Sequence, residues 1–141
     1  MSLPKPPKRA RKPKRRIRRQ AKRKAKLHDA DKLFSQYIRG RDGWACVRCG
    51  SPYSPQCAHL VSRRYRATRW VPENAVCLCQ KCHMKFTHDP IAFEDWCEVK
   101  WPGRLEMMKG VARANIRQHD HAGYDELCTS LRAAIGLRLE P

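Results

Sequence analysis

Two cysteine pairs, Cys46-Val-Arg-Cys49-Gly50 and Cys79-Gln-Lys-Cys82-His83, frame the stretch of sequence that decides the fold. Each pair has the C-x-x-C spacing of a zinc knuckle, and two such knuckles can place four thiolates tetrahedrally around one Zn²⁺. Four thiolates leave no open position on the ion, so the zinc is expected to be structural and not catalytic. The spacing therefore predicts one zinc site that holds the segment 44–61 against the segment 74–88.

Other cysteines and one histidine compete with this ligand set. Cys57 and Cys77 lie near the knuckles and are alternative ligands, although ordinary reduced thiols are the simpler interpretation. His83 directly follows the second knuckle and is able to replace a cysteine in the zinc shell. Cys97 and Cys128 fall within predicted helices, where we expect them to be core residues.

Apolar spacing and turn signals predict mainly helices around a few short extended segments. Asp89-Pro90 combines an N-cap with a first-turn proline, and Gly40 ends an earlier helical pattern. Helices are expected over residues 18–39, 81–87, 90–101, 104–118 and 123–138, and extended segments over residues 44–47, 56–61 and 75–78. This combination predicts an α+β fold.

Positive charge is concentrated at the start of the chain. Of 31 Lys and Arg residues, 14 lie in residues 1–26, which contain no acidic residue, and the formal net charge of the chain is +18. Such a segment repels itself, buries no apolar surface and attracts polyanions. Nucleic acid is the favoured partner, because neutralised phosphates release condensed counterions. A solubilising or nuclear-targeting tail is the alternative.

The chain is therefore expected to consist of a basic, largely disordered nucleic-acid-binding arm (1–26) and a folded domain (27–141). Within the arm, the candidate phosphate contacts are Lys14, Arg15, Arg16, Arg18 and Arg19. The sequence has no secretory signal and no run of about 20 apolar residues that would span a membrane. Paired C-x-x-C units indicate metal binding in a reducing compartment. We expect a soluble intracellular protein, cytoplasmic or nucleoid-associated.

Three polar residues lie between and directly after the knuckles: His59 in the stretch Cys57-Ala-His59-Leu-Val, Asn74 after a Pro-Glu turn, and His83. Taken one at a time, each has a simpler interpretation. His59 is compatible with a structural histidine, and Asn74 is an ordinary turn residue. Their joint occurrence around two knuckles is what indicates a functional site.

A zinc knuckle that encloses His, Asn and Cys-x-x-Cys-His resembles the His-Asn-His (HNH, ββα-metal) endonucleases. The stretch from Ala58 to Asn74 is similar, more narrowly, to the NinG/Rap-type phage recombination endonucleases. The resemblance covers residues 43–97, about two-fifths of the chain. It implies an HNH nuclease domain with a small zinc-stapled ββα-metal (His-Me finger) core over 43–97, flanked by helices.

The resemblance also implies roles for the three residues. His59 would be the general base, since a neutral imidazole can take a proton from water near pH 7. Asn74 would fix the orientation of the histidine through its surroundings. His83 would bind a catalytic Mg²⁺ or Mn²⁺ ion that supplies electrostatic stabilisation. The sequence departs from the family pattern at Ala58, where many members carry a further metal ligand.

A second ligand for the catalytic ion is therefore not identified by the sequence. Thr87 shares a helical face with His83, whereas His88 or Asp89 would serve only if the helix ended before them. Water ligands are the remaining alternative, which Mg²⁺ accepts readily.

Four arginines follow the proposed base, and we expect them to contact phosphates beside the cut, unless this segment is an ordinary solvated loop. These residues are Arg63, Arg64, Arg66 and Arg69. Backbone contacts of this kind report the shape of DNA and not its sequence.

The leading hypothesis is a metal-dependent DNA endonuclease that hydrolyses phosphodiester bonds. By resemblance, its substrate is branched or recombination-intermediate DNA, and cutting a junction twice favours a homodimer. The alternative is a non-catalytic zinc-ribbon nucleic-acid-binding protein, either ribosome-associated or accessory to recombination. It accounts for the arm and the cysteines, but not for the joint occurrence of His59, Asn74 and His83.

Overall fold

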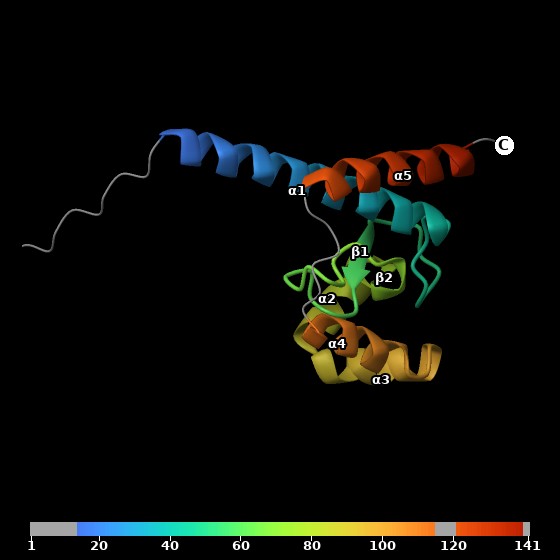
Figure 1. The fold of residues 1–141 in the computed structure, drawn as a ribbon. Helices are drawn as coiled ribbons and strands as arrows, with labels where there is room; N and C mark the ends of the chain where they lie inside the picture. Colours follow the sequence, from blue (N-terminus) through green and yellow to red (C-terminus); the bar gives the residue numbers. More distant parts are fainter. Residues whose placement is uncertain (1–13, 115–120, 140–141) are drawn as a thin grey trace, which may run out of the picture.

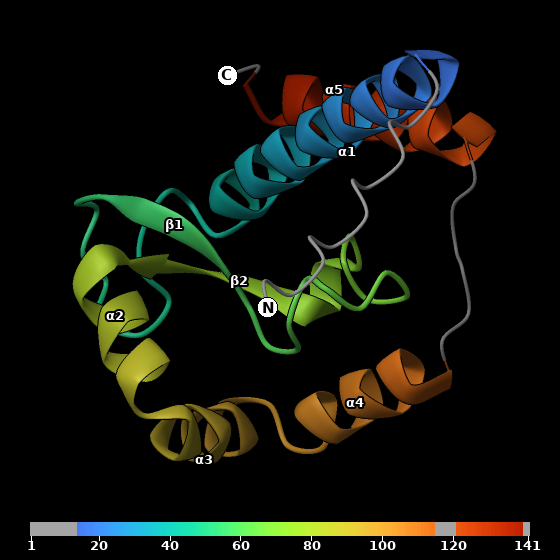
Figure 2. The same ribbon diagram turned by 90° about the vertical axis from the view of Figure 1, so that its left-hand side faces the viewer.

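A two-stranded sheet lies between two layers of helices (Figures 1 and 2). The computed structural model describes residues 14–114 and 121–139, an α+β arrangement. The elements follow in the order α1 (Lys14–Arg41), β1 (Pro55–His59), the 3-10 turn η1 (Pro72–Asn74), β2 (Ala75–Cys79), α2 (Gln80–His88), α3 (Pro90–Lys100), α4 (Arg104–Ala114) and α5 (His121–Leu139).

The two strands are antiparallel, and their register brings the second C-x-x-C pair and His59 to opposite ends of the sheet. Pro55 lies opposite Cys79, and His59 lies opposite Ala75. Every residue of β2 is buried. The strand passes directly into α2, so the second C-x-x-C pair spans the junction between a strand and a helix.

The predicted extended segment over 44–47 is wrong. Gly43 and Trp44 both have positive φ, +69° and +57°, and the Trp44 backbone N–H caps α1 by donating to the Arg39 carbonyl at 2.7 Å. A strand cannot begin at such a residue, because the left-handed region reverses the chain direction. The first knuckle is therefore a turn, closed by a bond from the Gly50 N–H to the Cys46 carbonyl at 2.7 Å.

Alternate residues of β2 face two different cores, as the pleat of a strand requires. Val76 and Leu78 belong to a core shared with α2, α3 and α4, which also contains the cysteine knuckles. Ala75 belongs to a second core, which α1 and α5 form with Trp70 and Tyr124. The Asp89 side chain caps α3 by accepting from the Ala92 N–H at 3.0 Å, as its Asp-Pro sequence predicts.

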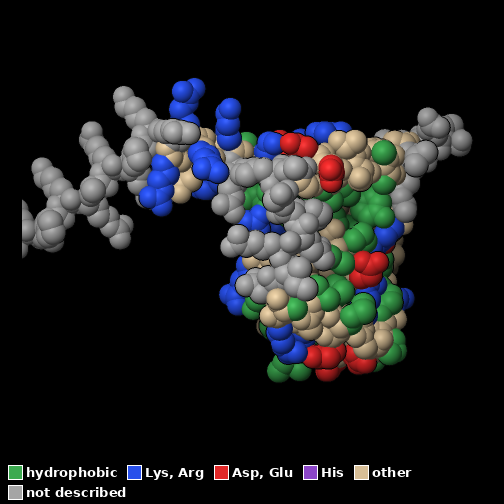
Figure 3. All heavy atoms as spheres, viewed as in Figure 1, with side chains coloured by type: hydrophobic (Ala, Val, Ile, Leu, Met, Phe, Trp, Pro, Cys, Tyr) green, Lys and Arg blue, Asp and Glu red, His purple; other side chains and the backbone are tan. Residues whose placement is uncertain are grey.

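Helix α1 begins at Lys14, four residues before the predicted start at residue 18, so this part of the basic arm is helical in the structure. This part of α1 extends beyond α5 (Figure 1), and Lys and Arg side chains surround it (Figure 3). The expectation for residues 1–13 lies outside the described residues, as does the last part of the helix expected over 104–118. None of the described helices is long and apolar enough to span a membrane.

An ion pair at the end of α1 joins this helix to η1 and β2. The Arg41 guanidinium pairs with the Asp42 carboxylate at 2.7 Å and donates to the carbonyls of Pro72 at 2.7 Å and Ala75 at 2.9 Å. The same carboxylate accepts the backbone N–H of Cys77 at 2.8 Å. Both side chains are largely buried, so this pair fixes the C-terminal end of α1 against the buried strand.

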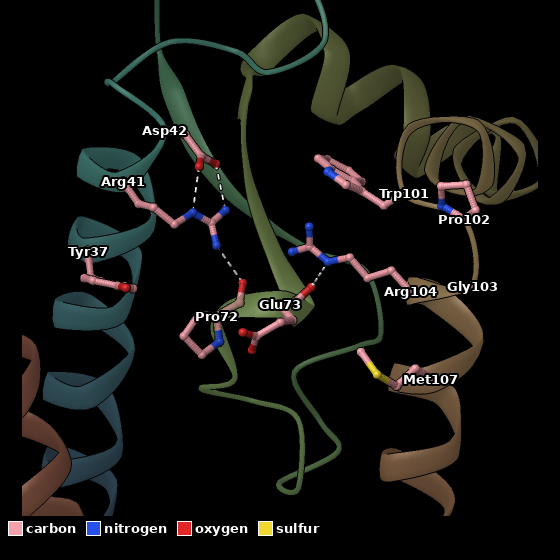
Figure 4. A pocket seen from close by; sticks show the side chains of 10 residues that line it. All are labelled: Tyr37, Arg41, Asp42, Pro72, Glu73, Trp101, Pro102, Gly103, Arg104 and Met107. Carbon is pink, nitrogen blue, oxygen red and sulfur yellow. Dashed lines mark hydrogen bonds and ion pairs between the residues drawn. The ribbon is translucent and has the colours of Figure 1, made fainter.

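A second arginine holds η1 from the opposite side. Arg104, the first residue of α4, donates from Nε to the Glu73 carbonyl at 2.6 Å and stacks on the Trp101 ring, 4.6 Å from its centroid. Figure 4 shows Arg41 and Arg104 approaching η1 from its two sides. The short turn that carries Asn74 is therefore held by two guanidinium groups from helices far apart in sequence.

Replacing Asp42 with Ala should lower the free energy of unfolding by about 2–4 kcal/mol, because the buried Arg41 and the Cys77 N–H would lose their partner. Denaturant unfolding of the zinc-saturated protein measures this change. Asp125→Ala is the matched control: it removes the exposed Lys26–Asp125 pair, which should cost less than about 1 kcal/mol. Equal losses in the two variants would contradict the role assigned to Asp42.

Candidate functional site: a cysteine cluster and a histidine pocket

The four knuckle cysteines come together at the junction of the first knuckle, β2 and α2. Their sulfur atoms all lie within 4.8 Å of one another, and the Cys49 Sγ is 3.7 Å from the Sγ atoms of both Cys79 and Cys82. A tetrahedral zinc ion with Zn–S bonds of ~2.3 Å requires S···S separations of about 3.8 Å. The cluster, completed by Cys46, could therefore hold a metal ion such as zinc.

Positive groups and backbone N–H donors surround these sulfurs. Burial alone would raise the pKa of Cys46, but backbone hydrogen bonds, including those from Cys79 and Cys49, lower it to about 7. Burial raises the pKa of Cys82 to about 12, and the Arg48 guanidinium, which donates to the Cys82 Sγ at 3.4 Å and lies over the Phe86 ring, acts in the opposite direction. The bonds to Cys46 and the bond from Arg48 each favour thiolate, the form of cysteine that binds metal.

The competing ligands lie outside the cluster. Cys57 and Cys77 face each other across the sheet, and burial raises the pKa of their thiols to about 12 and about 11. His83 is not among the four clustered residues, and its ring forms a hydrogen bond with Gln56, described below. Cys97 and Cys128 are buried in the two cores, as expected.

A Cys79→Ser variant should lose bound zinc, from about one ion per chain to near none, and should unfold without a cooperative transition, because the metal supplies much of the folding energy of such sites. Metal analysis and thermal circular dichroism measure the two effects. Cys57→Ser is the matched control and should keep one zinc per chain. Loss of zinc from the Cys57→Ser variant would instead show that Cys57 is a zinc ligand.

A separate pocket of about 420 Å³ brings together His59 from the end of β1 and His83 from α2. The other residues that line it come from α1, β1 and the loop after β1; they are Asp31, Phe34, Ser35, Cys57 and Arg63. The two histidines are 24 residues apart in the sequence, and the β1–β2–α2 path of the chain places them at one opening. Neither is a zinc ligand.

The hydrogen bond of His59 determines which ring nitrogen is basic. Its Nε2 is 2.9 Å from the Arg69 carbonyl oxygen, which can only accept, so Nε2 carries the proton and Nδ1 keeps its lone pair. No described residue hydrogen-bonds Nδ1. Burial is the main reason that the pKa of His59 lies below 6.5; the bond to Arg69 acts in the opposite direction. His59 is therefore a neutral imidazole near pH 7.

His83 has the complementary arrangement. Its Nδ1 is 2.7 Å from the Gln56 side-chain oxygen, so Nδ1 carries the proton and Nε2 keeps a lone pair that a metal ion can accept. Burial lowers the pKa of His83 below its usual value. Gln56 was missed by the sequence analysis, since a glutamine in a strand carries no signal until its partner is known.

The three proposed auxiliary ligands do not join His83 in this pocket. Thr87 uses its hydroxyl to donate to the His83 carbonyl at 2.8 Å, and Asp89 uses its carboxylate to cap α3. His88 is an exposed residue at the end of α2. Among residues 14–114 and 121–139, the cysteine cluster is the only group of three or more Cys, His, Asp or Glu placed to hold a metal.

Asn74 is fully buried and fixes the loop that follows β1. Its side-chain oxygen accepts the Val61 N–H at 2.8 Å, and its amide donates to the carbonyls of Val61 at 2.9 Å and Thr68 at 3.0 Å. Every bond that this side chain makes is to backbone, so it closes residues 61–68 into a fixed loop. The carbonyl that orients His59 belongs to the next residue, Arg69.

The four loop arginines differ in their surroundings. Arg63 is exposed at the rim of the histidine pocket, and Arg64 is exposed beside Tyr65. Arg66 is half-buried over the Tyr124 ring. Arg69 was expected to contact phosphate. Its guanidinium instead pairs with Asp31 of α1, which occupies the N–H groups that would bind a phosphate.

The five basic residues proposed in the arm all belong to α1. The side chains of Arg16, Arg18 and Arg19 are exposed on it, and Lys14 and Arg15 form its first turn.

Comparison with known proteins identifies no relative. No protein-family model, no curated protein and no solved structure matches the chain. The function is therefore inferred from the chemistry of the cysteine cluster, the histidine pocket and the cationic helix.

Proposed function

We propose that this protein is a metal-dependent DNA endonuclease of the HNH (ββα-metal) class, most similar in its motifs to the NinG/Rap-type enzymes. The observation that carries the proposal is the histidine pocket. His59 and His83 line one opening, and their hydrogen bonds leave lone pairs on Nδ1 of the first and Nε2 of the second. A purely structural pair of histidines would not require two uncommitted nitrogens at one opening.

His59 would act as general base in the hydrolysis. Its Nδ1 takes a proton from a water molecule, whose oxygen forms a bond to phosphorus while the bond from phosphorus to the 3′-oxygen breaks. The departing oxygen then takes a proton from solvent. Because the pKa of His59 lies below 6.5, the imidazole is unprotonated at pH 7 and ready to accept. Asn74 fixes the loop before Arg69, and the Arg69 carbonyl accepts the Nε2 proton, which leaves the lone pair on Nδ1.

His83 would hold the catalytic ion, Mg²⁺ or Mn²⁺, through Nε2. When bound, such an ion stabilises negative charge on the phosphate and the departing oxygen. One imidazole is a small donor set, which suits a cation that retains water molecules and binds substrate oxygens directly. The cysteine cluster, through its zinc, would keep α2 and therefore His83 beside β1.

The proposed substrate is DNA, bound mainly through its phosphates. Arg63 and Arg64 are exposed next to the pocket, and the cationic half of α1 extends from the same helix that lines it. Branched or recombination-intermediate DNA, cut by a homodimer, is the more specific form of the proposal. The alternative, a non-catalytic zinc-ribbon protein that binds nucleic acid, is supported by the cysteines and the charge, but it assigns no role to the histidine pocket.

A His59→Ala variant should lose at least ~10²-fold of its cleavage rate, since a positioned general base contributes about that much. Plasmid nicking with Mg²⁺ or Mn²⁺ measures the rate, and metal analysis and a DNA-binding titration should match wild type. His28→Ala, which removes an exposed histidine of α1, is the control and should cut normally. Wild-type protein that binds DNA but never cuts it, across linear, flapped and four-way substrates, would favour the zinc-ribbon alternative.

Replacing both Arg18 and Arg19 with Ala should reduce the slope of log K against log salt for DNA binding by about 2, because each lost phosphate contact releases about 0.9 fewer counterions. Alanine retains the helix, so the change isolates charge. The control is Lys100→Ala with Lys109→Ala, which removes the same charge from α3 and α4, in the helical layer on the other side of the sheet (Figure 1). If both double variants change the slope equally, α1 is not a specific contact.

A further inference from the structure

The Asp31 side chain of α1 binds two residues of the loop after β1. One of them, Arg69, also provides the backbone carbonyl that accepts the hydrogen bond from His59. One carboxylate oxygen accepts from Arg69 Nε at 2.8 Å and from Trp70 Nε1 at 3.0 Å, and the other accepts from Arg69 Nη2 at 2.5 Å. The side chains of both Asp31 and Arg69 are largely buried. Burial alone would raise the pKa of Asp31, but the hydrogen bonds from Arg69 hold it below its usual value, so the carboxylate stays charged.

The peptide of Arg69 is therefore held on both sides. Asn74 holds the carbonyl of Thr68, the residue before it, and Asp31 holds the side chains of Arg69 and Trp70. Between these two anchors lies the Arg69 carbonyl, which accepts the proton of His59 Nε2 at 2.9 Å. The Val71 N–H also donates to the Thr68 carbonyl, and the Trp70 ring packs on Tyr124, but only Asp31 among these contacts binds the Arg69 side chain itself.

The same helix also contacts the imidazole directly. Phe34, three residues after Asp31 and so on the same face of α1, has its ring centroid 5.7 Å from that of His59. One face of α1 thus sets both the position of the ring and the position of the oxygen to which it donates.

We infer that Asp31 is a positioning residue for His59: by fixing Arg69, it keeps the imidazole proton on Nε2 and the lone pair on Nδ1. The inference rests on the proposed role of His59 as general base. The inference also makes a structural claim, that α1 controls the tautomer of His59. This claim can be measured without an assay of DNA cleavage. It also assigns Arg69 to the positioning of the base and not to phosphate binding.

The test uses the full-length, zinc-loaded protein and three variants. Asp31→Asn removes the charge but keeps a similar shape, and Arg69→Lys keeps the charge but loses the two-pronged contact. Asp125→Asn is the matched control, because it removes a different ion pair of α1, that of Lys26, which does not include Arg69. Circular dichroism and zinc content establish that each variant is folded, and Arg69→Lys replaces Asp31→Asn should the latter not fold.

The first measurement is ¹⁵N NMR of the His59 ring at a pH well above its pKa. Wild type and Asp125→Asn should show the proton almost wholly on Nε2, whereas Asp31→Asn and Arg69→Lys should show a mixture with the Nδ1-protonated form. The second measurement is nicking, in which Asp31→Asn and Arg69→Lys should lose about 10–100-fold in kcat with KM within about twofold, since binding groups are unchanged.

If the His59 tautomer is unchanged in both Asp31→Asn and Arg69→Lys, the inference is overturned, whatever the nicking rates show. A changed tautomer in a protein whose wild-type form never cuts DNA supports the positioning role and rejects the nuclease. A changed tautomer with unchanged kcat also overturns the inference, because the proton position would then have no effect on the base.

Discussion

The fold depends above all on the convergence of four cysteine sulfurs at the point where β2 becomes α2. The first knuckle is a turn with no strand of its own, and its cysteines, a few backbone bonds and the side chains of Val47 and Arg48 attach it to the sheet and α2. Because His83 directly follows the last of these cysteines, the cluster also fixes the first turn of α2 beside β1. His83, which lines the histidine pocket, is therefore adjacent in the chain to the cysteine cluster.

Around this centre, long-range polar contacts fix backbone that has no regular structure. Arg41 and Arg104 hold η1 through its carbonyls, and η1 in turn presents Asn74 to the loop after β1. Each of these side chains satisfies backbone groups that a loop would otherwise leave to solvent. A pocket whose walls are loop and turn thereby acquires the rigidity that a positioned base requires.

Helix α1 joins the two proposed activities, DNA binding and cleavage. Its first half carries exposed cations, and its second half contributes Asp31, Phe34 and Ser35 to the pocket. Along an α-helix, residue 19 and residue 31 are about 18 Å apart, at 1.5 Å per residue. Duplex held by the cationic half would therefore lie within a few base pairs of the two histidines.

The sequence by itself determined the features that depend on neighbouring residues. The C-x-x-C spacing predicted the cysteine cluster, apolar spacing predicted the helices, and Asp89-Pro90 predicted the start of α3. It was wrong about residues 44–47, where the cap of α1 places Trp44 in the left-handed region, and it placed the start of the first helix at residue 18, whereas α1 begins at Lys14. Only the tertiary structure paired Asp31 with Arg69 and Gln56 with His83. Such pairs join single polar side chains from distant segments, and a lone polar residue has no periodicity from which its partner could be read.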